Sequence, residues 1–424
     1  MTAVLFVSMV ILLLLGVPIA FILVGSSALA LVADGGTNLS IIIQRMFSGT
    51  GSFTLLAIPF FVLAGNLMSA GGISRRLVNL CNSFLGHIPG GLAMVAVATC
   101  AFFAAISGSS AATAAAVGAI IIPEMLKHNY DRNFAAATIA SSAELGVIIP
   151  PSIGLIQYGV AAEQSIGELF MAGFLPGLFI CCTLMAVAHI LAKKQGFIPA
   201  KKSTAGERVK SFKDAILAVM MPVIILGGIY SGFFTPTEAA VVAVFYGLVV
   251  GVFVYREIKI KDLGKIFYDS VLTMATVCLI MSASTIFGWI LAREQIPQAL
   301  AQTFLSISSS KYVFLILINI MLLIVGCFCE AGAAMVILAP LLAPIAQTLG
   351  IDLIYFGIIM MTNLAIGMMT PPVGVNLYVV CDSAKVKIEG MMKYLMIYFA
   401  VLVVDLMIVT FVPPLSLLIP NLFS

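Results

Sequence analysis

Two stretches of this sequence place small polar residues and prolines inside apolar helical patterns. One is AAISGSSAATAAA (Ala104–Ala116) and the other is LGVIIPPSIG (Leu145–Gly154). In lipid, such breaks would leave backbone N–H and C=O groups unpaired, so they occur only where they are buried in protein or face an aqueous cavity. Carbonyl oxygens freed at a break suit a hard cation such as sodium, and paired broken helices near mid-membrane are typical of secondary transporters. The two stretches therefore predict an ion and substrate site.

The same pattern occurs a second time, later in the chain. VGCFCEAGAAM (Val325–Met335) corresponds to the Ser/Gly stretch, and LAIGMMTPPVG (Leu364–Gly374) corresponds to the Pro-Pro stretch. The prolines match at one offset, because 344−123, 371−150 and 372−151 each equal 221. We therefore interpret the chain as a duplication, with one hairpin tip and one helix break in each half.

An anionic substrate would find no cationic side chain here, because neither the tips nor the breaks contain Lys or Arg. Half-helices that start at about Ser109 and Ala331 would point their N-termini into the cavity, each worth roughly half a positive charge with free N–H donors. Hydrogen bonds to substrate hydroxyls would come from Ser109, Ser110, Thr113, Thr362, Asn363 and Asn376. The alternative for these side chains is local, with serine as a helix cap and threonine bonded to its own backbone.

Four acidic residues lie in or beside apolar segments, namely Glu144, Glu238, Glu330 and Asp405. An ionisable residue in such a place is a functional hypothesis by default. Glu144 neighbours the first break and Glu330 the second tip, so we expect these two to tune the cation sites. For Glu238 and Asp405 we expect interfacial or packing roles. A proton-coupled carrier or a channel that uses the membrane-embedded glutamates is the alternative to sodium coupling.

The sequence does not predict an enzyme. An intramembrane enzyme would need a nucleophile and a base, or a cluster of acids. The three histidines (His87, His128 and His189) lie at segment ends, and neither an HExxH motif nor an Asp-rich motif occurs. We therefore expect no catalytic residues.

The composition indicates an all-α polytopic membrane protein. Of the 424 residues 62% are hydrophobic and only 9% are charged, whereas soluble proteins have about 25% charged residues. The net charge of +3 is too small to indicate nucleic-acid binding. The eight cysteines have neither CxxC pairs nor histidine partners, which supports neither a disulfide framework nor a zinc site.

The lengths of the apolar segments define the elements around the predicted site. Gly90–Leu126 is too long for one span and slightly short for two, so it predicts a re-entrant hairpin whose tip stops at mid-membrane. A tight pair of complete spans is the alternative. Tyr312–Ala346 predicts a second hairpin by the same argument, and the broken helices are expected at Arg132–Ala162 and Leu353–Val380. Val4–Ala33 would extend about 45 Å against ~30 Å of hydrocarbon, so we expect one span that tilts or bends at Gly16-Val17-Pro18.

The distribution of basic residues predicts the topology. Lys193–Lys213 contains seven basic residues against one Glu, which places this linker in the cytoplasm. The linker separates a first repeat (residues 1–192) from a second (residues 214–424), and helices on the membrane surface are expected at Ile73–Gly86 and Ile296–Leu305. Counting from the linker gives nine full spans, an inside N-terminus and an outside C-terminus. The two repeats are then inverted relative to one another, as in alternating-access transporters.

These motifs identify a resemblance to the large membrane subunit of tripartite ATP-independent periplasmic (TRAP) transporters. It covers nearly the whole chain and includes IPFFVLAGNLM (Ile58–Met68), SGSSAATAAA, IIPPSIGLIQYG (Ile148–Gly159) and TPPVGVNLYV (Thr370–Val379). The sequence is most similar to the sialic-acid branch. The resemblance implies an elevator-type transporter in the bacterial inner membrane that takes up an organic acid with sodium and uses no organic cofactor. It also implies two partners, a small four-helix membrane subunit and a periplasmic substrate-binding protein.

The resemblance also implies the sodium ligands. One sodium site would lie between the first tip and the first break, and the repeat offset places a second site in the other half. The residues of the first site are Ser107, Gly146, Ile149 and Pro151, and those of the second are Phe328, Gly367, Thr370 and Pro372.

Overall fold

In the computed structural model of this chain, every regular element of the described residues is helical. The described residues are 1–195, 197, 202–307, 310–371 and 374–423. The first half contains α1 (Thr2–Leu14), α2 (Ile19–Asp34), α3 (Ser40–Thr50), the 3₁₀ turn η1 (Phe53–Leu56), α4 (Ala57–Ala70), α5 (Ile73–Leu85), α6 (Gly91–Ser107), α7 (Ser110–Lys127), α8 (Arg132–Ala143), α9 (Leu145–Ile148), α10 (Ile153–Ala161) and α11 (Ile166–Lys194).

The second half repeats this organisation with longer crossing helices. It contains α12 (Ala205–Tyr230), α13 (Pro236–Leu248), the π-helical turn η2 (Val249–Val254), α14 (Ile260–Arg293), α15 (Ile296–Ile307), α16 (Lys311–Phe328), α17 (Ala331–Thr348), α18 (Leu353–Met368), α19 (Val375–Ala384), α20 (Ile388–Phe411) and α21 (Pro414–Phe423). Among the described residues, nine helices are long and apolar enough to cross a membrane, or ten if the bent pair α8–α10 is one span. The predicted all-α polytopic fold class is confirmed.

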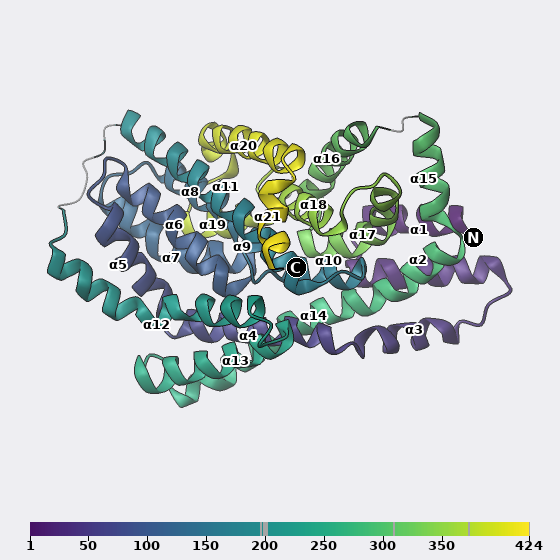
Figure 1. The fold of residues 1–424 in the computed structure, drawn as a ribbon, viewed down its shortest axis with the longest axis horizontal. Helices are drawn as coiled ribbons and strands as arrows, with labels where there is room; N and C mark the ends of the chain where they lie inside the picture. The colour runs from purple at the N-terminus through teal and green to yellow at the C-terminus, as the bar shows by residue number, and fades with distance from the viewer. Residues whose placement is uncertain (196, 198–201, 308–309, 372–373, 424) are drawn as a thin grey trace.

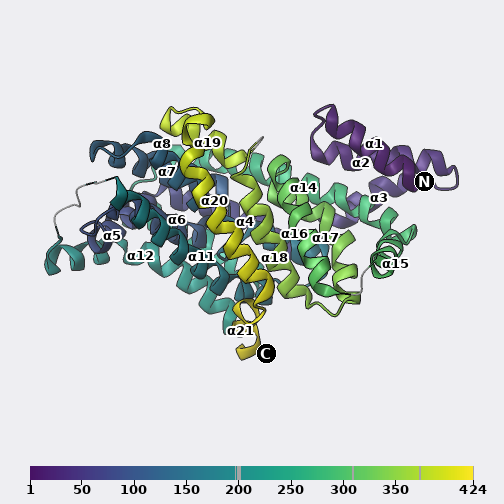
Figure 2. The ribbon, with the colours of Figure 1, turned by 90° about the horizontal axis from the view of Figure 1, so that it is seen from above.

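The N-terminal segment differs from its prediction. The chain turns back between Leu14 and Ile19, and α1 packs against α2 as a helical hairpin (Figure 2). Both ends of this hairpin reach the end of α14, where Thr2 donates to Glu294 (3.2 Å) and Arg293 pairs with Asp34 (3.1 Å). The expected single span over Val4–Ala33 is therefore wrong, because Pro18 fixes a turn and not a bend. The predicted inside N-terminus was obtained by counting Val4–Ala33 as one crossing. Because this segment is two helices, the fold does not support that prediction.

The helix before the second repeat starts earlier than its apolar run. We expected a span over Ala215–Phe234, but α12 begins at Ala205 inside the basic linker. The reason is a capping box, in which Thr204 and Glu207 each satisfy the other's backbone N–H. The charged end of the linker is therefore helical, and the gaps in the described residues between 195 and 202 fall in its first part.

The last predicted span is divided in the structure. The sequence predicts one helix over Met391–Leu418, but α20 ends at Phe411 and α21 begins at Pro414. Pro413 and Pro414 explain the division, because proline removes a backbone donor and cannot continue a preceding helix.

The two predicted hairpins are present, and each has a short turn. The α6–α7 turn consists of Gly108 and Ser109, with Gly108 in the left-handed region (φ 63°), and the α16–α17 turn consists of Cys329 and Glu330. The first broken helix bends by 42° between α9 and α10. Its break lies inside a segment long enough to cross the membrane, and the first tip packs against that break. Because α7, α16 and α17 are each also long and apolar enough to cross a membrane, the re-entrant form of the two hairpins stays a prediction.

The two halves of the chain exchange their half-helices. The helix that follows the first break, α10, packs against α17 of the second hairpin, and α19 packs against α7 of the first hairpin. Figure 1 shows this exchange, with α19 among the helices of the first half and α10 beside α17. The long helix α14 runs beside α2, α3 and α4. The tips and breaks of both halves are thereby brought to one central region.

Candidate functional site

The first hairpin tip and the first helix break touch one another, and we call their contact the first junction. The backbone N–H of Ile153, just after the break, donates to the carbonyl of Gly108 in the tip (3.2 Å). A Cβ at Gly108 would lie 2.7 Å from the carbonyl oxygen of Pro151. Glycine is needed at this position both for its left-handed backbone and for this close approach.

Several oxygens gather on the tip side of the first junction. The hydroxyls of Ser107 and Thr113 lie 3.1 Å apart, and they donate to the Ser109 carbonyl at 3.3 and 2.8 Å respectively. A Cβ at Gly146 would lie 2.6 Å from that carbonyl oxygen and 2.7 Å from the Thr113 hydroxyl. The break therefore approaches a cluster of hydroxyl and carbonyl oxygens, which is the donor set a hard cation prefers.

The second tip and the second break form an equivalent second junction. The N–H of Gly374 donates to the Cys327 carbonyl (3.4 Å). The backbones of Gly326 and Gly367 are in direct contact, because a Cβ at Gly326 would lie only 2.9 Å from the Gly367 Cα. Each half of the chain thus joins its tip to its break by a backbone hydrogen bond and a glycine contact.

The structure brings together most of the residues predicted to bind sodium. In the first junction, Ser107 and Gly146 adjoin the oxygen cluster, and Ile149 ends α9 with extended backbone. In the second junction, Thr370 lies next to the break and its hydroxyl donates to the Ile366 carbonyl (2.9 Å).

The remaining predicted sodium residues are less informative. Gly367 takes part in the glycine contact, and its carbonyl accepts the N–H of Thr370 (2.8 Å). Phe328 is the last residue of α16 and its side chain is exposed. Pro372 lies outside the described residues.

A cavity of about 740 Å³ lies between the two tips. It is bounded by both hairpin tips, both broken helices, the start of α2 and the middle of α14. Its lining includes Pro18, Phe21, Gly108, Ser109, Ser110, Val147, Gly154, Gln157, Thr273, Thr276, Glu330, Gly332, Met368 and Val375. The described lining residues include one carboxylate, Glu330, and neither Lys nor Arg. A substrate anion would therefore rely on helix N-termini and hydroxyl groups.

Two of the six predicted substrate-binding residues line this cavity, and four do not. Ser109 and Ser110 line it at the start of α7. Thr113 is buried one turn further on and faces the first junction, where it bonds to Ser107. The other three (Thr362, Asn363 and Asn376) are fully buried in the contacts between helices.

A buried bridge joins the two halves beside the cavity. Asn376 of α19 donates to Oε1 of Glu144 (2.8 Å), and the Ser110 hydroxyl donates to Asn376 Oδ1 (3.4 Å). Glu144 is 0% exposed, and its Oε2 has no hydrogen-bond partner among the described residues. Glu144 therefore positions α19 against the first tip.

A second buried network surrounds α18. Asn363 donates to the carbonyl and side-chain oxygens of Asn319 in α16 (3.0 and 2.8 Å), and Asn319 donates to Thr410 of α20 (2.9 Å). The Tyr355 hydroxyl donates to the Thr410 carbonyl. Asn363 thus fixes the packing of three helices and does not face the cavity.

The other acidic residues have separate partners. Glu330 is the N-cap of α17, where its carboxylate accepts the N–H of Ala333 (3.0 Å). Glu238 belongs to the capping box of α13, and Asp405 accepts the hydroxyl of Thr183 in α11 (2.6 Å). The last two contacts agree with local roles for Glu238 and Asp405.

Three polar side chains of the cavity were not identified from the sequence. Thr273 and Thr276 line the cavity from α14, and Gln157 lines it from α10. The Thr273–Thr276 spacing is a helical i, i+3 repeat, but it is equally typical of threonines bonded to their own backbone, as both are here (3.1 Å each). Gln157 lies inside the motif that follows Pro150-Pro151, and a buried glutamine in an apolar run was the available signal.

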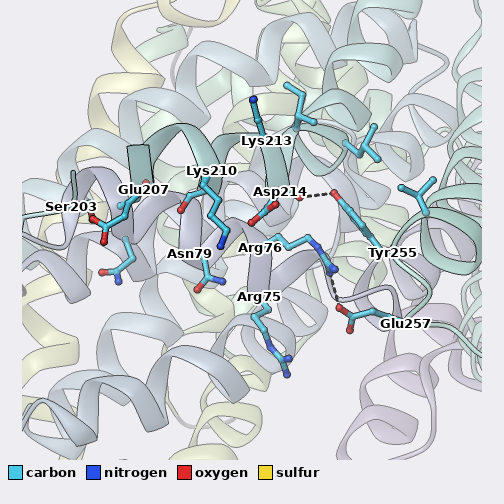
Figure 3. A pocket seen from close by; sticks show the side chains of 16 residues that line it. Arg75, Arg76, Asn79, Ser203, Glu207, Lys210, Lys213, Asp214, Tyr255 and Glu257 are labelled. Atoms are coloured by element: carbon cyan, nitrogen blue, oxygen red, sulfur yellow. Dashed lines mark hydrogen bonds and ion pairs between the residues drawn. The ribbon is translucent and has the colours of Figure 1, made fainter. Parts of the chain in front are cut away.

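A larger polar cleft lies away from the tips, between α5 and the start of α12 (Figure 3). Arg76 crosses it and donates to Glu257 (2.8 Å) and to the Gly72 carbonyl (3.0 Å), with its guanidinium 3.7 Å from the centre of the Tyr255 ring. Burial raises the pKa of Tyr255, so this ring stays neutral under the cation. Arg75, Lys210 and Asp214 also line the cleft. The contacts of Arg76 in this cleft anchor α5. Because both tips and both breaks lie elsewhere, the cleft is a poor candidate for the substrate site.

Comparison with known proteins matches nearly the whole chain to one family. A family model for the DctM component of tripartite ATP-independent periplasmic transporters matches residues 6–415. The chain is 47% identical, over 95% of its length, to an isethionate TRAP transporter permease protein of Oleidesulfovibrio alaskensis, and spans 63% of that relative. It is 40% identical to a sialic acid TRAP transporter large permease protein of Vibrio cholerae, covering 97% of this chain and 96% of the relative. It is 41% identical to a C4-dicarboxylate TRAP transporter large permease protein of Pseudomonas aeruginosa, covering 93% of each.

Two solved structures share the fold at low sequence identity. One is the YdaH transporter of Alcanivorax borkumensis, with a TM-score of 0.65, 15% identity and coverage of 87% of this chain and 86% of the other. The second is MtrF of Neisseria gonorrhoeae, with a TM-score of 0.56, 13% identity and coverage of 88% and 83%. These likenesses concern the fold alone.

Proposed function

Because this chain belongs to the DctM family, the large membrane component of tripartite ATP-independent periplasmic transporters, we propose that it couples the uptake of an organic acid to sodium by an elevator movement. Members of this family are transporter permeases and not enzymes. The acid would be delivered by a periplasmic binding protein, and a small membrane subunit would complete the transporter in the inner membrane. The tripartite organisation in the family's name supports these two partners.

The observation that carries the proposal is the arrangement of the two junctions around one cavity. The cavity of about 740 Å³ is bounded by both tips. Oxygen groups gather at the first junction, at 2.8 to 3.3 Å from one another, and supply the hard donors that sodium requires. Sodium bound at a junction would hold a tip against its break, and the tip in turn forms a wall of the cavity. Substrate binding and ion binding would therefore favour one another.

The substrate class that we propose is an organic acid. Relatives at 40 to 47% identity are named for isethionate, sialic acid and C4-dicarboxylate, all of which are acids. Sialic acid is one candidate among these, and the identities do not favour it. The cavity lacks a described Lys or Arg and offers the N–H groups at the start of α7 to the acid group.

Reconstitution tests the proposal. The purified transporter, with its binding protein and a radiolabelled acid outside, should take up the acid along an inward sodium gradient. Replacing sodium by choline at a fixed proton gradient should abolish uptake. Uptake that persists without sodium but requires the proton gradient would favour the proton-coupled carrier, in which Glu144 would be the first residue to examine. Uptake of free acid at full rate by this chain alone would refute the role of the partners.

A further inference from the structure

The two hairpin tips that bound the cavity carry different caps. At the first tip, the Ser109 hydroxyl accepts the N–H of Ala112 (3.4 Å) and α7 begins with a neutral cap. At the second tip, the Glu330 carboxylate accepts the N–H of Ala333 (3.0 Å) and α17 begins with an anionic cap. Both caps line the same cavity.

This difference gives the cavity one positive end and one negative end. A helix N-terminus is equivalent to roughly half a positive charge. At α7 the described lining residues near Ser109 are uncharged, and the buried Glu144 lies behind the cavity wall, where it reaches Ser110 only through Asn376. At α17 the full negative charge of Glu330 exceeds the helix charge, so that end is negative overall. An acid group would therefore bind at the start of α7 and be repelled at the start of α17.

A second observation places an additional acceptor at the negative end. Gln157 is only 2% exposed, and its Oε1 has no hydrogen-bond partner among the described residues. Its amide lies against Gly332 in the first turn of α17, where a Cβ would overlap it. A buried amide oxygen without a donor destabilises the structure around it. A ligand that supplies a hydroxyl or an ammonium group at this end would satisfy it.

We propose that the cavity selects acids that carry a hydroxyl or amino group, and that it rejects dicarboxylates. The acid group would lie at the start of α7, and the donor group would lie between Glu330 and Gln157. This inference rests on the proposed function and names the substrate class of the same cavity. A second carboxylate would meet Glu330 at the far end. Repulsion between these two like charges should weaken the binding of a dicarboxylate by about tenfold.

Direct binding to the membrane component tests this selectivity, because the periplasmic binding protein has a selectivity of its own. The purified transporter in sodium buffer, without the binding protein, is titrated with six acids and its thermal stabilisation is followed. Isethionate, lactate and sialic acid carry hydroxyls, ethanesulfonate and propionate carry none, and succinate is a dicarboxylate. At least one hydroxyl-bearing acid should bind tenfold or more tightly than its plain counterpart and than succinate.

Two variants separate charge from hydrogen bonding. Glu330→Gln keeps an oxygen to cap α17 but removes the charge, so it should strengthen succinate binding at least tenfold. Gln157→Leu should remove the preference for the hydroxyl and leave succinate binding weak. Asp352→Asn is the matched control, since Asp352 also caps a helix, accepting the Tyr355 N–H (2.9 Å), but does not line this cavity. The control should bind all six acids within twofold of the parent protein.

Equal binding of the plain, hydroxyl-bearing and dicarboxylic acids would overturn this inference alone. So would a Glu330→Gln variant with the selectivity of the parent. If the protein bound none of the six acids but remained folded, both the inference and the proposed function would be overturned.

Discussion

Adding one methyl group at Gly146 should weaken sodium binding much more than it weakens the fold. In Gly146→Ala the new Cβ would lie 2.6 Å from the Ser109 carbonyl oxygen, whereas ordinary contacts begin at 3.4 Å, so the first junction must open by about 0.8 Å. Such a displacement takes the carbonyl out of reach of an ion held on the break. Losing one contact to a charged group costs roughly 1.5–3 kcal/mol. The sodium concentration for half-maximal effect should therefore rise roughly 10- to 100-fold.

The fold itself should change little, because two effects oppose one another. Overpacking in a core costs typically 1–3 kcal/mol, whereas alanine is favoured over glycine inside a helix by about 1 kcal/mol. Gly118→Ala is the matched control. Its Cβ would lie 3.4 Å from the nearest atom, the Ile139 Cγ2, which is an ordinary contact between α7 and α8. This control should keep the parent's sodium dependence and should be slightly more stable.

Two readouts check this prediction. Uptake in proteoliposomes at a range of sodium concentrations gives the half-maximal value, and the sodium-dependent rise in melting temperature gives ion binding without transport. If Gly146→Ala and Gly118→Ala had the same sodium dependence in both measurements, the first junction would not be an ion site. A general loss of stability in Gly146→Ala at every sodium concentration would show that the contact is only structural.

Three other perturbations give separate predictions. Asn376→Ala removes the partner of the buried Glu144 and should destabilise the protein by about 1–3 kcal/mol, and adding Glu144→Gln should recover part of this loss in the same thermal melts. Gly367→Ala should open the second junction and raise the sodium concentration for half-maximal uptake, because its Cβ would lie 2.4 Å from the Gly326 Cα, and the sodium dependence of uptake would detect this. Uptake of a monoanion with two sodium ions moves one net positive charge inward, which is worth about 2.3 kcal/mol per 100 mV. An inside-negative potential imposed with valinomycin should therefore accelerate uptake. Uptake that does not respond to the potential would contradict a stoichiometry of two sodium ions.

The positions of Gly, Ser and Pro in the sequence predicted the hairpins and the helix breaks. The expected hairpin over Gly90–Leu126 is α6–α7, and its tip at Ser107–Ser110 is where the chain turns. Gly, Ser and Pro act on the backbone where they stand, so their effect can be read without knowing the neighbours. The same reasoning located the turn at Gly16-Val17-Pro18, although not its sharpness, since a bend and a reversal have the same sequence signals.

The orientation of side chains within the site depended on contacts between distant segments. Thr113 lies one helical turn after Ser109, and only the approach of Gly146 explains why it faces the junction and not the cavity. Asn376 likewise bonds to Glu144 because α19 crosses to the other half of the chain. Hydrophobic periodicity describes one segment at a time and carries no information on such exchanges.

Matching the two halves also concealed a difference in charge. Matching the two halves by their prolines treats Ser109 and Glu330 as equivalent cap positions, and the backbone supports that equivalence because each begins the second helix of a hairpin. One cap is neutral and the other carries a charge. The two halves therefore share a backbone plan, while the cavity between them is electrically asymmetric.

Ser109 provides the physical link between ion binding and substrate binding in the proposed mechanism. Its carbonyl faces the first junction, where it accepts the hydroxyls of Ser107 and Thr113 (3.3 and 2.8 Å), and its side chain caps α7 at the cavity wall. An ion that orders this carbonyl would also fix the first N–H groups of α7, which are the groups offered to the acid. Without the ion, those N–H groups would be free to reorient, and the acid would have to supply the ordering free energy itself. Ser109 would thus make acid binding depend on sodium, because its carbonyl lies at the ion site and its hydroxyl caps the helix that faces the acid.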